Sequence, residues 1–267
     1  MGVIAPLIEN FLVGPLQMRC SVVTDCVTGD TVIIDGGDEP QRLIDWIESC
    51  QGTGPHWSTH TDEDTKSIQR KVVALLNTHA HFDHSGHIPT LKKHFDVDWY
   101  LHPDDTFLQT LAKTAAVRYG IALPEPAIAD HDIADNQILS LGSIDFEILH
   151  TPGHTMESTC YLLLSSQNVE QAVFTGDTLF VGEVGRPDLA VNPNLTSKDL
   201  AKKLYQSIHN VLMKLPDDVV VYPGHGAGSA CGKNISAERE STIGTQKKCN
   251  YALQPMSEEK FVEIVLD

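Results

Sequence analysis

The stretch Val72-Val-Ala-Leu-Leu-Asn-Thr-His79-Ala-His81-Phe-Asp83-His84 decides the expected fold, because an apolar run leads directly into a cluster of polar side chains. The run Val72–Leu76 is typical of a buried strand. Three imidazoles and a carboxylate follow it within six residues. Neutral imidazole and carboxylate groups are ligands for Zn, Fe and Mn ions. The stretch therefore predicts a strand whose end carries part of a metal site.

Three later segments each place one more candidate ligand in a turn that follows an apolar run. They are Thr151-Pro-Gly-His-Thr155, Thr175-Gly-Asp-Thr178 and Tyr222-Pro-Gly-His-Gly226. Gly and Pro favour tight turns, and a turn at a strand end can direct a side chain toward a common point. Solvated loop histidines are the alternative, but chance would then have to place a ligand in every turn. We therefore predict one metal site made of His79, His81, Asp83, His84, His154, Asp177 and His225.

The composition is that of an acidic globular protein. Its 267 residues can bury a sizeable core, and 41% of them are hydrophobic. With 19 Lys and Arg against 36 Asp and Glu, the net charge of −17 argues against a nucleic-acid partner or an anionic membrane surface. No apolar run reaches the ~20 residues that span a bilayer.

The cysteines and the N-terminal segment indicate a reducing compartment. The six cysteines form no Cys-x-x-Cys pair, so reduced thiols are expected. The N-terminal segment has no basic region and is a poor signal peptide. We expect a cytoplasmic protein, or one of the mitochondrial matrix if the source is eukaryotic. The sequence leaves the oligomeric state open, a homo-oligomer included.

The hydrophobic pattern alternates between strands and helices. Short apolar or β-branched runs predict strands at Cys20–Thr24, Thr31–Asp35, Ile144–His150, Thr159–Leu164, Ala172–Thr175 and Val219–Tyr222. Helical spacing predicts helices at Gln41–Cys50, Ile88–His94, Pro103–Tyr119 and Thr196–Leu215, and one from about Ser257. We expect a single domain over residues 1–267, with a polar loop or insertion at about 52–71 and a C-terminal tail and helix at about 228–267. Two sheets between layers of helices fit this order.

The order and spacing of the candidate ligands resemble those of the metallo-β-lactamase superfamily. The resemblance covers nearly the whole chain and rests on His79, His81, Asp83, His84, His154, Asp177 and His225. It implies an α/β fold, the four-layer αββα metallo-β-lactamase sandwich, with the metal site at one edge of the sheets. The superfamily hosts many chemistries, so the fold alone does not fix the reaction.

The two halves of the chain resemble different members of that superfamily. Asn77–His84 and Leu101–Asp105 look like the glyoxalase II-type thioester hydrolases, and Phe82 stands where persulfide dioxygenases usually have Ala. The later segments resemble persulfide dioxygenases, especially those fused to a C-terminal rhodanese domain. These segments are His150–Ser158, Thr175–Leu189, Tyr222–Ser236 and Asn250–Pro255. A rhodanese is therefore a candidate partner, either as a separate protein or as part of a longer chain.

The two resemblances imply different metal centres. In the dioxygenase, His79, His154 and Asp177 would hold one Fe(II), and this two-His-one-carboxylate set leaves positions for a persulfide sulfur and O₂. The other four candidates would orient ligands or bind substrate and water. In the hydrolase, two Zn ions would share all seven residues, with Asp177 as the bridge. Asp83 and Asp177 are the candidate catalytic residues.

Arg186 and Lys233 are the candidate substrate-binding residues. Arg186 lies nine residues after Asp177 in a Gly-Arg-Pro turn, and a cation there can anchor the anionic end of a thiol carrier. A surface pair with Asp188 or Glu183 is the alternative. Lys233 is the next candidate, and the neighbouring Cys231 either faces the site or is a small buried residue.

The predicted function is that of a metal-dependent persulfide dioxygenase. It would oxidise a low-molecular-weight persulfide, such as glutathione persulfide, with O₂ to sulfite and thiol. The alternative is a dinuclear Zn thioester hydrolase of the glyoxalase II type, that is, a hydroxyacylglutathione hydrolase. A non-catalytic metal-binding partner of a sulfur-transfer enzyme is disfavoured by the complete set of ligands.

Overall fold

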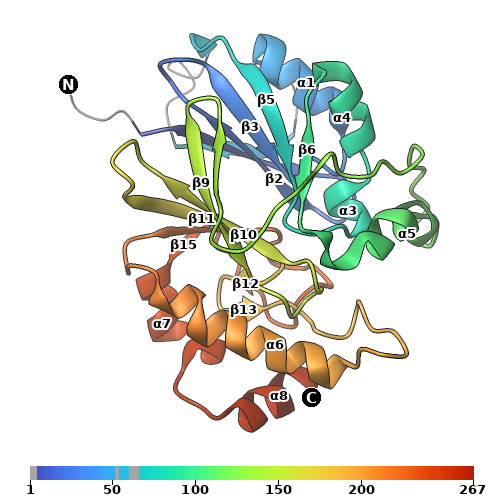
Figure 1. The fold of residues 1–267 in the computed structure, drawn as a ribbon, viewed down its shortest axis with the longest axis vertical. Coiled ribbons are helices and arrows are strands. Elements are labelled where there is room, and N and C mark those ends of the chain that lie inside the picture. The colour runs from blue at the N-terminus through green and yellow to red at the C-terminus, as the bar shows by residue number, and fades with distance from the viewer. Residues whose placement is uncertain (1–4, 52–53, 60–65) are drawn as a thin grey trace. The chain divides into compact units, whose positions relative to one another are not determined.

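The structure is a computed structural model that describes residues 5–51, 54–59 and 66–267 (Figure 1). The chain divides into two compact units. The first comprises Met1–Ile133 with Leu139–Asp145, and the second comprises Ala134–Ile138 with Phe146–Asp267. The expectation of one domain over the whole chain stays a prediction, and each unit is described by itself below.

The first unit contains a seven-stranded sheet in the order β4-β1-β2-β3-β5-β6-β7. In that order the strands span His56–Ser58, Leu7–Val13, Met18–Thr24, Asp30–Ile34, Lys71–Leu76, Trp99–Leu101 and His131–Asp132. Strands β1, β2 and β3 pair antiparallel, whereas β3, β5, β6 and β7 are parallel. Because parallel neighbours end at the same edge of a sheet, the residues that follow β3 and β5 come close together.

Helices cover this sheet and bury its apolar side chains. The helices are α1 (Pro40–Ser49), α3 (Phe82–Ser85), α4 (Ile88–Phe95) and α5 (Thr106–Val117), and the 3₁₀ turn η1 (Pro103–Asp105) precedes α5. Leu43 and Ile47 of α1 and Leu91 of α4 join one buried cluster with Ile33 and Leu75 of the sheet. Apolar residues at helical spacing thus hold α1 and α4 on the strands that lead to the predicted ligands.

The second unit contains most of a six-stranded sheet in the order β15-β14-β11-β10-β9-β8, whereas Leu139–Leu141 of β8 and the start of β9 belong to the first unit. In that order the strands span Ser241–Thr242, Val220–Pro223, Glu170–Gly176, Thr159–Leu164, Ile144–His150 and Ile138–Leu141. A small hairpin, β12 (Leu179–Phe180) with β13 (Glu183–Val184), follows β11. Strands β11 and β14 are parallel, so the residues that follow them, Asp177 and His225 among them, leave the sheet at the same edge.

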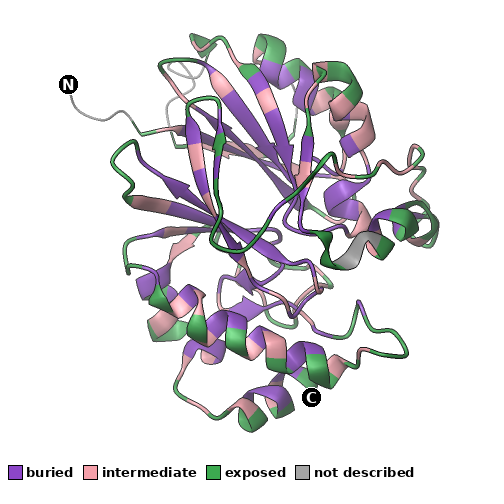
Figure 2. Cartoon of the chain, in the orientation of Figure 1, coloured by how far each residue is buried: buried purple, intermediate pink, exposed green. Residues whose placement is uncertain are grey.

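Three helices pack on the second sheet. They are α6 (Ser197–Asn210), α7 (Ile243–Cys249) and α8 (Glu258–Leu266), and the 3₁₀ turns η2 (Leu212–Lys214) and η3 (Tyr251–Leu253) lie between them. Thr196 and Asp199 form the predicted capping box at the start of α6. Leu204 and Ile208 of α6 and Phe261 of α8 belong to the buried core. Figure 2 shows the resulting alternation of buried and exposed residues along α6.

The predicted strands and helices are present, with three informative differences. The long helix predicted to reach Leu215 ends at Asn210, because Pro216 holds Leu215 extended and the last turn tightens to a 3₁₀ turn. Within the expected loop 52–71, residues 56–58 form β4 against β1, and the His56 ring stacks on Phe11; residues 52–53 and 60–65 lie outside the described part. Short strands such as β12 and β13 were not predicted.

In the part of the chain that the structure describes, none of the helices combines the length and hydrophobicity that crossing a bilayer requires.

Candidate metal centre

The ligands predicted in the first unit lie where β5 ends and α3 begins. His79, Asp83 and His84 are buried, and His81 is half-buried. The Nε2 atom of His79 lies 3.0 Å from Nδ1 of His81. The Nε2 atom of His84 lies 3.9 Å from Oδ2 of Asp83. Four side chains of the metal-ligating types thus lie in the segment from the end of β5 into α3.

Asp35, which sequence reasoning missed, supports this group from the end of β3. Its carboxylate accepts hydrogen bonds from the Asn77 side chain (3.1 Å), the Thr78 amide (2.8 Å) and the Thr78 hydroxyl (2.7 Å). It also lies 3.0 Å from Nδ1 of His84. Asp35 is buried and reaches these groups because β3 and β5 are parallel neighbours. An Asp as the last residue of the predicted strand Thr31–Asp35, directly before Gly36-Gly37, was the signal in the sequence.

These contacts determine which ring nitrogens are available as ligands. The Thr78 hydroxyl donates to Asp35, so toward Nδ1 of His79, 3.1 Å away, it acts as the acceptor. The Nδ1 atom of His84 donates to Asp35 for the same reason, since a carboxylate only accepts. Both rings then carry their proton on Nδ1 and present the lone pair of Nε2, which is how outer hydrogen bonds orient metal-binding histidines.

The ligands predicted in the second unit converge on one buried carboxylate. Asp177 follows β11, His225 follows β14, and both are buried. The Oδ2 atom of Asp177 lies 3.5 Å from Nε2 of His154 and 3.8 Å from Nε2 of His225. A buried carboxylate is stable only with compensating positive charge or hydrogen bonds. Two imidazole nitrogens around it are a donor set that fits a divalent ion.

His154 is held in the ligand tautomer by the backbone of Arg186. Its Nδ1 atom lies 2.9 Å from the Arg186 carbonyl oxygen, which can only accept, so Nδ1 carries the proton and Nε2 faces Asp177. The chain reaches this position through Gly185. A Cβ atom on Gly185 would lie 1.7 Å from the Asp177 carbonyl oxygen and 3.2 Å from Nδ1 of His154. Only glycine permits this close approach.

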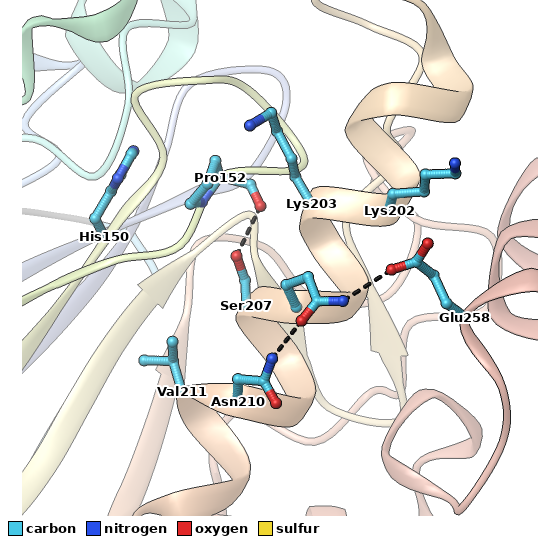
Figure 3. Close-up of a pocket in the computed structure, with 9 residues that line it drawn as sticks. His150, Pro152, Lys202, Lys203, Ser207, Asn210, Val211 and Glu258 are labelled. Carbon is cyan, nitrogen blue, oxygen red and sulfur yellow. Dashed lines mark hydrogen bonds between the residues drawn. The ribbon is translucent and has the colours of Figure 1, made fainter.

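Helix α6 supports the turn that carries His154. Ser207 of α6 donates to the carbonyl oxygen of Pro152 (2.7 Å), a contact visible in Figure 3. Gly153 has a φ of +151°, and a Cβ atom there would lie 2.4 Å from Cβ of Leu204. The turn therefore rests directly on the helix. A cavity of about 420 Å³ lies alongside, lined by His150, Lys203 and other residues of this turn and helix.

The candidate substrate-binding residues have partners within the second unit. Arg186 makes two hydrogen bonds to Asp188, from Nε (3.0 Å) and from Nη2 (2.6 Å). The Arg186 guanidinium lowers the pKa of Asp188, since it stabilises the carboxylate. The Nζ atom of Lys233 lies 3.3 Å from the Ile264 carbonyl oxygen. The pair with Asp188 is the surface alternative that the sequence also indicated, and a substrate-binding role for either cation stays a prediction.

Cys231 joins the cluster in the second unit. The ligand-type atoms of Asp177, His225 and Cys231 lie within 4.8 Å of one another. The Cys231 carbonyl oxygen accepts from the Arg186 amide (3.0 Å), which places the thiol beside the carboxylate. The sequence left open whether Cys231 faces the site, and the structure brings it to these two residues.

Each unit therefore carries its own group of metal-ligating side chains with fixed orientations. In the second unit, His154, Asp177 and His225 offer two imidazoles and a carboxylate, side chains of the types that bind Zn, Fe and Mn. In the first, His79 and His81 offer two ring nitrogens 3.0 Å apart. That the two groups bind the same ion or ions stays a prediction.

Comparison with known proteins identifies the family. The sequence profile of the metallo-beta-lactamase superfamily matches residues 13–225. The hydroxyacylglutathione hydrolase GloC of Haemophilus influenzae is 31% identical over 94% of this chain and 99% of its own length. Similar solved structures include the following two. TTHA1623 in a di-iron-bound form is 30% identical, with a TM-score of 0.66 over 91% of this chain and 98% of that one.

ETHE1 from Myxococcus xanthus has a TM-score of 0.70 over 97% of this chain and 90% of that one, and at 22% identity it shows the fold alone. The two large sheets with their helices confirm the predicted metallo-β-lactamase fold class. The chain belongs to the metallo-beta-lactamase superfamily.

Proposed function

We propose that the protein is a metal-dependent persulfide dioxygenase that converts a low-molecular-weight thiol persulfide and O₂ into sulfite and thiol. The observation that supports the proposal is a pair of hydrogen bonds in the second unit. They join three segments whose sequences resemble those of persulfide dioxygenases. His154 donates to the Arg186 carbonyl, and the Arg186 amide donates to the Cys231 carbonyl. The segments around positions 154, 186 and 231 thus form one hydrogen-bonded assembly around Asp177.

In this proposal His79, His154 and Asp177 would hold one Fe(II). The bound ion would supply the place where O₂ and the persulfide sulfur meet. The protein contributes orientation: Nδ1 of His154 is fixed by a carbonyl, and Nδ1 of His79 is fixed by Thr78. Asp177 contributes the one negative charge of the ligand set, in a buried position where charge acts strongly.

The remaining polar residues would then manage substrate and protons. The overall reaction consumes one O₂ and one water per persulfide and releases sulfite, thiol and two protons. His81, half-buried beside His79, and His225 beside Asp177 have ring nitrogens that can accept or donate a proton. Arg186 would bind a carboxylate of the carrier thiol, in exchange for its present contact with Asp188.

A second candidate is a dinuclear thioester hydrolase, which the 31% identity to GloC over nearly both full lengths favours. Here all seven candidate ligands would hold two ions, and Asp177 would lie between them. Asp83 would bind one of the ions, whereas in the dioxygenase it only orients neighbouring groups. The two functions therefore differ in metal content as well as in the reaction catalysed.

One experiment separates the two candidates. The protein is purified with its native metal, Fe and Zn are counted per chain, and two assays are run on the same preparation. We expect about one Fe per chain, O₂ uptake with glutathione persulfide, and no hydrolysis of lactoylglutathione. Two metals per chain with hydrolysis alone would support the second candidate. Asp177→Asn keeps the side-chain shape but removes the charge, and it should lose the metal together with whichever activity is found.

A further inference from the structure

Glu183 is a buried carboxylate that belongs to none of the predicted ligand groups. It begins β13 and is 3% exposed. Its Oε1 atom accepts from the Val184 amide (3.0 Å) and from the Tyr251 hydroxyl (2.5 Å). Its Oε2 atom accepts from the Asn234 amide (3.1 Å). One carboxylate thus joins the β12–β13 hairpin, the loop that follows His225, and the C-terminal part of the chain.

Burial makes these contacts stronger than surface hydrogen bonds. Hydrogen bonds to a carboxylate are stronger than those between neutral groups, and they offset the cost of burying it. Burial of the Tyr251 hydroxyl, together with the Glu183 carboxylate beside it, raises the pKa of Tyr251, so the phenol remains a donor.

The groups that Glu183 joins are those that surround the second-unit ligands. The β12–β13 hairpin connects Asp177 to Arg186, and the Arg186 carbonyl oxygen orients His154. The loop that follows His225 includes Cys231. The Cys231 carbonyl oxygen accepts a hydrogen bond from the Arg186 amide (3.0 Å). Glu183 lies between the two segments and holds the loop at Asn234.

The C-terminal residues brace the same hairpin from a second direction. Asn250 donates from its side chain to the Glu183 carbonyl oxygen (3.1 Å) and to the Phe180 carbonyl oxygen (3.4 Å). Gln246 accepts from the Gly182 amide (2.9 Å). Asn250 and Gln246 are fully buried. A buried polar network with satisfied partners rigidifies the segments it connects.

We propose that Glu183, with Tyr251, is a positioning residue that fixes the 226–236 loop against the β12–β13 hairpin and so sets the place of Arg186 and Cys231. It acts through these segments and touches no substrate itself. The consequence for catalysis rests on the proposed function, whereas the anchoring of the loop does not.

Hydrogen exchange measured by mass spectrometry tests the anchoring directly. Asn234 is exposed, and its amide is hydrogen-bonded to the Glu183 carboxylate. In Glu183→Gln only one of the two terminal side-chain atoms is an acceptor, so the Val184 and Asn234 N–H groups can no longer both be bound as they are by the carboxylate. We expect peptides covering 226–240 to exchange at least about tenfold faster, while the β5 peptide Lys71–Leu76 is unchanged. Tyr251→Phe should give a smaller change in the same peptides.

Glu263→Gln is the matched control, because Glu263 is an exposed glutamate on α8. It should leave every peptide unchanged. Cleavage by trypsin after Lys233 gives a second local readout, and it should accelerate in Glu183→Gln but not in Glu263→Gln. Unchanged exchange at 226–240, or an equal acceleration in both units, would overturn the proposal. If Glu183→Gln does not fold, Tyr251→Phe decides the matter on the same peptides.

Kinetics then test the consequence for the site. Glu183→Gln should keep its metal, raise the KM for the persulfide by about tenfold and change kcat by less than about threefold. In the double variant with Arg186→Ala, the increase in KM should be smaller than the product of the two single increases. Both changes act through the contact between Arg186 and the substrate. If the wild-type protein consumes no O₂ with persulfide, the proposed function fails, but the exchange result at 226–240 still decides the role of Glu183.

Discussion

The imidazole Nδ1 of His154 lies 2.9 Å from the backbone carbonyl of Arg186, so a predicted metal ligand and a predicted substrate anchor are in direct contact. Because the contact uses the backbone of Arg186, a change of its side chain leaves the support of His154 in place. The two roles can therefore be separated by mutation.

Arg186→Ala should keep its metal and a kcat within a few fold of wild type, while its KM for the persulfide rises by roughly ten- to a hundred-fold. This range corresponds to the loss of a charge-assisted hydrogen bond of ~1.5–3 kcal/mol. Uniform binding of the carrier end changes KM rather than kcat. Steady-state kinetics with metal analysis of each preparation give the answer, and an unchanged KM would assign Arg186 to the surface.

Asp188→Asn is the complementary variant. Asp188 accepts two hydrogen bonds from the Arg186 guanidinium, and this contact lowers the pKa of the Asp188 carboxyl. Removal of the competing charge should lower the KM for an anionic substrate by a few fold. Added salt screens the attraction between the Arg186 guanidinium and an anionic substrate. It should therefore weaken substrate binding in wild type and in Asp188→Asn, and weaken it less in Arg186→Ala, which lacks this charge. A raised KM in Asp188→Asn would indicate that the pair itself shapes the site.

Asp35→Asn should weaken metal binding without unfolding the protein. Asp35 has a φ of +57°, a conformation that Asn also tolerates, so the backbone need not change. The amide cannot accept every hydrogen bond that the carboxylate accepts, and His84 and Thr78 lose part of their support. We expect a ten- to hundred-fold loss in metal affinity, measured by competition with a chelator. Asp132→Asn, at an exposed position, is the control and should bind metal like wild type.

Asp83→Ala distinguishes one ion from two. If a single iron is held by His79, His154 and Asp177, this variant should retain about one metal per chain. If the centre is dinuclear, the variant should lose one ion and with it any thioester hydrolysis. Metal content after gel filtration decides between these outcomes, and two metals that fall to one would contradict the mononuclear proposal.

His209 makes stability depend on pH. Its ring packs against Tyr205 and lies half-buried near Phe261, and burial lowers its pKa below the ordinary value of 6.5. The unfolded chain therefore binds this proton more readily than the folded protein. The contribution of His209 is complete above pH 6.5 and declines as pH falls from 6.5 through the lowered pKa. In His209→Phe, the melting temperature should fall less between pH 7.5 and 5.5 than in wild type.

The candidate ligands could be proposed from the sequence because each lies in a local pattern, an apolar strand followed by a turn. That they bind metal stays a prediction. Asp35 was not predicted because its role depends on the pairing of β3 with β5, which brings it to His84, 49 positions away in the chain. Strand β1 was not predicted for a different reason. Glu9 lies fully buried within it, in an ion pair with Arg70, and interrupts the apolar pattern.

The hairpin of β12 and β13 could not be predicted, since two-residue strands show no periodicity. The proposed positioning role of Glu183 in this hairpin could not be predicted either, because its hydrogen-bond partners Asn234 and Tyr251 lie far away in the sequence. The distances are 51 positions to Asn234 and 68 to Tyr251.

The decisive measurement for the proposed dioxygenase reaction is the ratio of O₂ consumed to sulfite formed when the iron-containing protein turns over glutathione persulfide. We expect one O₂ per sulfite, a rate proportional to iron content, and no sulfite under anaerobic conditions. Sulfite-free turnover without O₂ uptake, in a protein that hydrolyses lactoylglutathione, would contradict the proposed reaction.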